Sequence, residues 1–174
     1  MPDVERTANK LKEYGFQIGQ ISFFEAEGTK EIYIESDKSA SLLLMQPTKE
    51  GPYQKALNKR GPSLHHIAID VIDLEISIKQ MTDMGWQLHA NSQETIKDIR
   101  VAWLFKSGFP SLIEIAEVSA FSTAAAFVKK IILPIPSEHQ QLLNIFNLQN
   151  YIQPVSGETE FLFGQKYFKI SDLI

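Results

Sequence analysis

Apolar and polar residues alternate along the chain in a pattern that occurs twice. Residues 4–14 (VERTANKLKEY) and 74–84 (LEISIKQMTDM) place apolar or small side chains at helical spacing, and a glycine suited to a helix C-terminus follows each stretch. Matching tripeptides flank the two stretches at an offset of 70 residues: DVE at 3–5 with DLE at 73–75, and GFQ at 15–17 with GWQ at 85–87. The pattern predicts two copies of one unit, each with a helix of about three turns.

Strand-like runs follow each predicted helix, separated by turn signals such as Glu-Gly-Thr and Ser-Asp-Lys-Ser. The first helix is followed by runs at 17–27, 31–35 and 41–46, and the second by runs at 87–90, 100–106 and 112–118. A further strand, residues 64–71, precedes the second helix. Its counterpart in the first copy would end at Met1, so we expect an α+β fold of βαβββ units whose first unit lacks its first strand.

The missing strand has two explanations. Either it was lost, or the recorded start lies downstream of the real one. If it was lost, another strand must cover the open sheet edge, and residues 128–135 are the candidate.

The remaining residues set the domain boundaries. Residues 1–47 form the truncated first unit, 48–61 a linker that includes a short helix, and 62–118 the complete second unit. Residues 119–126 (SAFSTAAA) form a joint before a partial C-terminal unit at 127–174. That last segment predicts a strand that ends near two prolines, a helix capped by Ser137, and two further strands.

Composition and charge exclude several classes of function. The chain has 17 basic and 21 acidic residues, a net charge of -4, and no cysteine. It therefore offers no basic surface for nucleic acid or anionic lipid and no disulfide or thiolate chemistry. The charged N-terminus lacks an apolar signal segment, and no apolar run is long enough to span a membrane. We expect a cytoplasmic protein whose partner is a small molecule, with any metal held by histidine and carboxylate.

Strand alternation separates the two adjacent histidines of LHHIAIDV (64–71). His66, Ala68 and Asp70 fall on one face, while the other face is mostly apolar and should lie under the helices. His65 falls on that second face and is expected to point away as a capping or supporting imidazole. In SLIEIAEV (111–118), the same alternation separates Glu114 from the apolar Ile113 and Ile115.

The motifs GPSLHHIAIDVIDLE (61–75), MGWQLH (84–89) and SLIEIAEV (111–118) resemble the vicinal oxygen chelate superfamily, especially its methylmalonyl-CoA epimerase and glyoxalase-like branch. The resemblance covers about residues 3–118. It implies two βαβββ units paired into a cup-shaped mixed sheet with flanking helices, around one divalent metal. It also implies that His66 and Glu114 are metal ligands, with Glu114 as the catalytic base.

The family pattern also implies two ligands from the first unit, and the sequence departs from it at both. The strand that would carry a His or Gln is missing, and LLLMQP (42–47) has Leu43 or Leu44 in place of a carboxylate. We therefore keep two functions open. One is metal-dependent proton transfer of the lyase or epimerase type on a small oxoacid or thioester, with Zn, Mn, Co, Ni or Fe. The other is a non-catalytic ligand-binding or partner-binding protein with a degenerate site and no metal.

A homodimer offers a way to complete the site. If the second units of two chains met at a two-fold axis, His66 and Glu114 would each be supplied twice. Pairing of the two units within one chain is the alternative, and the short linker favours it.

Arg100 is a candidate for binding an anionic group of the substrate, whereas His89 and His139 are expected at the surface and Trp86 and Trp103 in the core.

Overall fold

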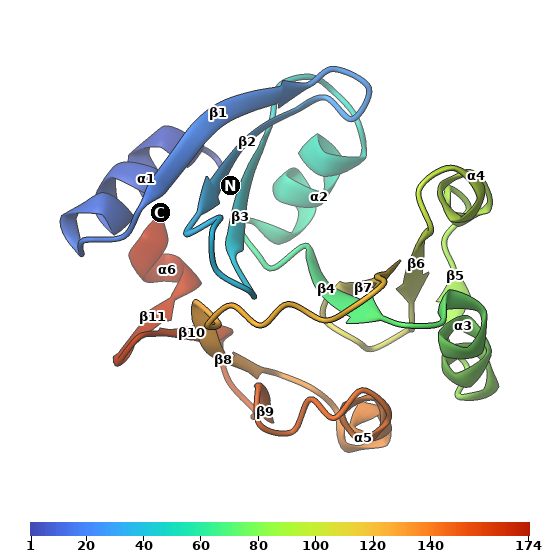
Figure 1. Ribbon diagram of the computed structural model, residues 1–174. Coiled ribbons are helices and arrows are strands. Elements are labelled where there is room, and N and C mark those ends of the chain that lie inside the picture. Colours follow the sequence, from blue (N-terminus) through green and yellow to red (C-terminus); the bar gives the residue numbers. More distant parts are fainter. The chain divides into compact units, whose positions relative to one another are not determined.

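The computed structural model describes residues 1–174, which form two compact units (Figure 1). The first unit contains residues 1–63, 123–132 and 158–174. The second contains residues 64–122 and 133–157. The chain is therefore mixed α+β, as predicted, and each unit has strands and helices of its own. No helix combines the length and the apolarity that crossing a bilayer requires.

The first unit begins at its helix, in agreement with the sequence pattern. A three-stranded antiparallel sheet of order β1-β2-β3 follows helix α1. Val4, Ala8 and Leu11 form the buried face of α1, which packs on this sheet. The bounds of these elements and of the linking helix are α1 Val4–Glu13, β1 Ile18–Phe24, β2 Thr29–Ile34, β3 Leu42–Pro47 and α2 Pro52–Arg60.

The second unit contains the complete strand, helix and three-strand pattern, with order β4-β7-β6-β5. Strand β4 runs parallel to β7, while β5, β6 and β7 are antiparallel neighbours. Helix α4, between β5 and β6, was not predicted. The bounds are β4 His66–Val71, α3 Leu74–Asp83, β5 Gln87–Leu88, α4 Ser92–Asp98, β6 Val101–Phe105 and β7 Leu112–Glu117.

Helices α1 and α3 repeat each other at the predicted offset of 70 residues, including their ends. The carboxylates of Asp3 and Asp73 each accept a hydrogen bond from a backbone N–H in the first turn. At the other end, Gly15 and Gly85 have φ of 87° and 81°, in the left-handed region that glycine tolerates best. The same local sequence signals therefore mark the start and the end of both helices.

Two opposite faces of the second sheet have different compositions. Ile67, Ile69, Ile113 and Ile115 are buried on the face that α3 covers. His66, Ala68 and Glu114 alternate with them and lie on the other face. The predicted separation of polar and apolar faces is therefore confirmed.

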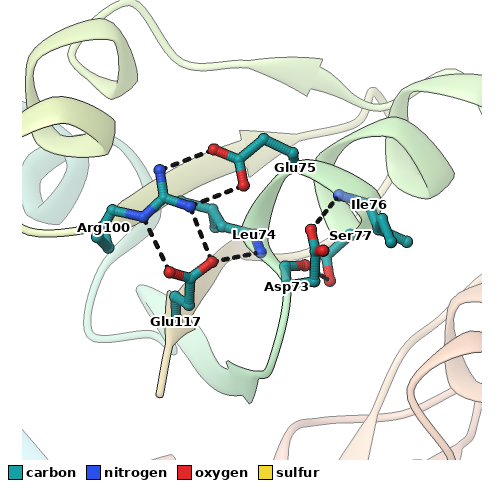
Figure 2. A network of polar contacts seen from close by, with 7 residues as sticks. All are labelled: Asp73, Leu74, Glu75, Ile76, Ser77, Arg100 and Glu117. Atoms are coloured by element: carbon teal, nitrogen blue, oxygen red, sulfur yellow. Dashed lines mark hydrogen bonds and ion pairs between the residues drawn. The ribbon is translucent and has the colours of Figure 1, made fainter. Parts of the chain in front are cut away.

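An arginine ties the N-terminus of α3 to two strand ends (Figure 2). Arg100, just before β6, donates two hydrogen bonds of 2.7 Å to Glu75 and bonds of 3.0 and 2.8 Å to Glu117. Glu117 also accepts from the backbone N–H of Leu74, at 2.9 Å. Arg100 adopts a φ of 55°, which is unfavourable for a non-glycine residue, and this network holds it there.

The C-terminal residues form a strand, two short helices, three strands and a last helical turn. The sheet order is β11-β10-β8-β9. Strand β8 does not cover the edge left by the missing first strand, because it pairs with β10 and β9 instead. The segment that leads into β8 meets the β2–β3 connection through a bridge between Ser39 and Ala126. The backbone N–H groups of Phe127 and Val128 also donate to the carbonyls of Ser39 and Ala40. The bounds are β8 Val128–Leu133, η1 Ser137–His139, α5 Gln141–Ile145, β9 Ile152–Pro154, β10 Glu160–Phe163, β11 Lys166–Lys169 and α6 Ile170–Leu173.

Candidate functional site

His66 and Glu114 come together on the face of the second sheet that α3 leaves uncovered. The two residues lie on the parallel neighbours β4 and β7, where Glu114 is paired with Ala68, two positions along from His66. His66 Nε2 is 3.6 Å from Glu114 Oε2, and both side chains are largely buried, with 16% and 20% of their surface exposed. Residues 48 positions apart in sequence thus form one polar pair, as strand alternation predicted.

The imidazole of His66 is neutral at pH 7. Burial lowers its pKa from the ordinary 6.5 to about 4, because a charged ring loses hydration that the protein does not replace. The carboxylate of Glu114 would favour the charged ring, but at 3.6 Å it makes no short hydrogen bond to it. Desolvation therefore dominates, and His66 is available as a hydrogen-bond donor or as a ligand.

His65 does not point away from the pair, which corrects the expectation from alternation. Its Nδ1 lies 3.0 Å from Nδ1 of His66, and the two rings are nearly perpendicular, at 87°. Alternation failed here because His65 precedes the first residue of β4, where the regular strand geometry begins. His65 thus contacts one nitrogen of His66, while the other faces Glu114.

Trp103 lines the same face of the sheet from the neighbouring strand β6. It is paired with Glu114, and its ring packs edge to face against His66 with centroids 4.8 Å apart. Trp86 is instead buried and packs against Phe109. The expectation of core packing is therefore correct for Trp86, whereas Trp103 helps to orient the His66 ring.

The pair fits only part of a metal site. Two donors 3.6 Å apart can both reach one ion, since bonds from nitrogen or oxygen to a transition metal are about 2 Å long. Nowhere in residues 1–174, however, do three or more His, Cys, Asp or Glu side chains gather in a way that could hold an ion. A single chain therefore does not supply a complete ligand set.

Strand register identifies Leu43 as the first-unit counterpart of Glu114. Leu43 pairs with Tyr33 as Glu114 pairs with Trp103, and Tyr33 and Trp103 are 70 residues apart. Leu44 is buried, and its neighbour Gln46 accepts a hydrogen bond from the N-terminus of α1, which places both on the helix-covered face. An apolar side chain thus occupies the position of the second carboxylate.

Three other candidate residues have structural partners. The guanidinium of Arg100 directs most of its N–H donors to Glu75 and Glu117, so its interactions in this structure are structural. His139 was expected at the surface but is buried, with 6% exposed, and its Nε2 lies 3.0 Å from the carbonyl oxygen of Ser107. His89 is half-buried and accepts from the backbone N–H of Asn91.

A buried carboxyl group in the first unit was missed by the sequence analysis. Glu31, on β2, is 6% exposed and accepts a 2.7 Å hydrogen bond from the hydroxyl of Thr29. Burial raises its pKa, with the Thr29 hydrogen bond acting against this rise and the charge of Glu27 adding to it. Strand alternation places Glu31 on the face opposite the buried Ile32 and Ile34, together with the exposed Tyr33, so the local pattern gave no signal of its burial.

Comparison with known proteins agrees with this fold. A profile described as the Glyoxalase/Bleomycin resistance protein/Dioxygenase superfamily matches residues 1–103, more than half of the chain. The chain therefore belongs to this superfamily, the vicinal oxygen chelate proteins, as the sequence motifs predicted. No match is found among curated proteins.

Solved structures with the same fold include methylmalonyl-CoA epimerases. The enzyme from Mycobacterium tuberculosis has a TM-score of 0.55 and 21% identity over 69% of this chain and 83% of its own. A Streptomyces coelicolor epimerase variant in complex with 2-nitronate-propionyl-CoA has 0.54 and 18%, over 70% and 92%. A hypothetical protein from Bacillus halodurans C-125 has 0.57 and 22%, over 70% and 91%. At these identities the likeness establishes the fold alone.

Proposed function

We propose that the second unit carries out proton transfer on a small oxoacid or thioester, with Glu114 as the base and His66 as the donor to the substrate oxygen. The observation that supports this most is the 3.6 Å separation of a carboxylate oxygen and a neutral imidazole nitrogen on the sheet face opposite α3. Methylmalonyl-CoA epimerases among the similar structures support a substrate of this kind, since epimerisation moves a proton at carbon.

The proposed step uses both members of the pair. Glu114 takes a proton from the carbon beside the carbonyl, and the electron pair of the broken C–H bond moves onto the carbonyl oxygen. The Nε2–H of His66 donates to that oxygen as it becomes an enolate, a task that a neutral imidazole can perform. Glu114 then returns a proton, exchanged with solvent water, to the same face of the carbon, which completes a hydrogen exchange. An epimerisation would also require a proton donor on the opposite face. The exchange itself needs no reactant besides water.

A metal is not required by this scheme. A divalent ion between His66 and Glu114 would polarise the same carbonyl, as the family resemblance implies. The chain brings only two donors to it, and Leu43 stands where another carboxylate would be needed. We therefore assign the step to the side chains of the protein itself.

Solvent deuterium uptake at the carbon beside the carbonyl tests the proposal. Pyruvate, 2-oxobutyrate and propionyl-CoA are incubated with the chelated protein in deuterated buffer and followed by mass spectrometry. Wild-type protein should accelerate uptake into at least one of them, and Glu114→Gln should slow it by about 100-fold. Asp70→Asn is the matched control, because Asp70 lies on the same strand and face as His66 but outside the pair. Uptake that Glu114→Gln leaves unchanged would reject the assignment.

Ligand binding without turnover is the second candidate function, and the apolar Leu43 at the carboxylate position favours it. Trp103 provides the readout, because its ring packs against His66. In this case a thioester or oxoacid should change the fluorescence of Trp103, measured with Trp86 replaced by Phe. No deuterium should then enter the ligand. Fluorescence change together with uptake would favour the enzyme.

A further inference from the structure

The contact between His65 and His66 restricts where the protons of the two rings reside. Two imidazoles whose Nδ1 atoms lie 3.0 Å apart can form a hydrogen bond only if one of these atoms carries a proton and the other does not. If His65 donates, the proton of His66 must be on Nε2. If His66 donates, its Nε2 is bare.

As the base of the proposed proton transfer, Glu114 must be ionised, and its negative charge then selects between these two arrangements. His66 Nε2 faces the carboxylate oxygen at 3.6 Å. A bare nitrogen would direct its lone pair at a negative oxygen, which is repulsive, whereas an N–H at the same place is attracted. Packing against Trp103 at 4.8 Å holds the ring in this orientation. The proton of His66 therefore belongs on Nε2, and His65 is the donor.

We infer that His65 is a positioning residue, which fixes His66 in the tautomer that presents Nε2–H beside Glu114. His65 then donates its Nδ1–H to Nδ1 of His66, and the Nε2–H of His66 points toward the carboxylate of Glu114. A ring with the opposite tautomer would present a lone pair to a developing enolate and would raise its energy. In this tautomer Nε2 of His66 carries a proton and has no lone pair for an ion. It could bind an ion only if the proton on His66 Nε2 and the proton on His65 Nδ1 both moved.

Nitrogen NMR tests the tautomer directly. Long-range proton–nitrogen correlation spectra of ¹⁵N-labelled, chelated protein at pH 7 distinguish a protonated ring nitrogen from a bare one, and His66→Gln identifies the His66 signals. We expect His66 to be protonated on Nε2 and bare on Nδ1, and His65 to be protonated on Nδ1. A His66 ring protonated on Nδ1 would overturn the inference.

Two substitutions of His65 separate positioning from packing. His65→Phe keeps a ring but removes the donor, whereas His65→Asn places an amide N–H near the position of Nδ1. We expect Phe to move the His66 nitrogen signals toward a mixture of tautomers and to lower kcat by at least about tenfold with little change in KM. His65→Asn should restore both the wild-type His66 nitrogen signals and the wild-type kcat. Equal effects of Phe and Asn on the spectra would contradict the inference.

The kinetic part of this test rests on the proposed proton transfer, but the spectra do not. Spectra as expected without any deuterium uptake would reject the proposed function and leave the tautomer assignment intact. Uptake by a protein whose His66 carries its proton on Nδ1 would reject the assignment and the role of His66 as donor to the enolate, and would leave only Glu114 as the base. Thermal unfolding of each variant shows whether the fold has survived.

Discussion

His66 combines a buried position with an ionisable ring, and this should make the stability of the protein depend on pH. Its pKa falls from 6.5 to about 4 on folding because burial penalises the charged ring. Between these values the unfolded chain binds more protons, so the free energy of unfolding should fall as pH drops from about 6.5 to about 4. The loss should total about 3 kcal/mol and level off below pH 4.

Urea unfolding of wild type and His66→Phe over this pH range measures the effect. The difference between the two proteins isolates His66 from the carboxylates that also titrate. His89→Phe is the control, because His89 is more exposed and lies outside the pair. Equal slopes for wild type and His66→Phe between pH 4 and 6.5 would show that the ring is not buried as described.

Glu31 should have the opposite dependence. Burial raises its pKa in the folded protein, so the unfolded chain releases the proton first as pH rises above the ordinary value of 4.5. Its contribution is therefore fully present below pH 4.5 and is lost as pH rises through the folded value. We expect Glu31→Gln to raise the urea midpoint at pH 7 and to lose that advantage at pH 4, with Glu25→Gln as the exposed control. A lower midpoint at pH 7 would contradict this expectation.

At the scale of elements, the Arg100 network should contribute more to stability than an ordinary surface ion pair. Arg100 joins the start of β6 to the end of β7 and the first turn of α3, whereas Lys79 and Asp83 form an exposed pair within α3 alone (Figure 2). We expect Arg100→Met to lower the melting temperature clearly more than Lys79→Met does. Arg100→Lys should not restore it, because one ammonium cannot make both bidentate contacts. Equal effects of the two Met substitutions would reject this role.

The same network should weaken in acid. Arg100 and then the backbone N–H of Leu74 lower the pKa of Glu117 from 4.5 to about 2. Its contribution is therefore present above pH 4.5 and is lost as pH falls toward 2. The difference in melting temperature between wild type and Arg100→Met should shrink over that window, and a constant difference would contradict the assignment.

Most elements were predictable from the sequence because their signals are local. Helices α1 and α3 begin at aspartate caps and end before glycines, and strand alternation together with the family resemblance placed His66 and Glu114 on one face. What escaped prediction depends on residues distant in the sequence or on side-chain rotation. His139 is buried because it reaches the carbonyl of Ser107, and His65 turns toward His66 outside the regular strand. Helix α4 is short and lacks a side-chain cap, so its sequence offered little signal.

At the scale of the whole molecule, the repeated unit has diverged in what it carries. The second copy presents His66 and Glu114, while the first has Leu43 at the position of the carboxylate. A homodimer that brings two second units together would supply two imidazoles and two carboxylates, and this arrangement stays a prediction. The proposed function places the step in the His66–Glu114 pair of a single second unit, and this step needs no metal.

The dependence of deuterium uptake on bound metal tests most directly whether the His66–Glu114 pair acts by itself. Protein purified without chelator is separated by size, stripped of metal, checked by elemental analysis, and assayed while Zn, Mn, Co or Ni is added in steps. We expect uptake by the stripped protein and no rise that saturates at a fixed number of ions per chain. The contradicting result has three parts. The stripped protein is inactive, added metal restores activity that saturates at one ion per two chains, and His66→Ala abolishes the restored activity.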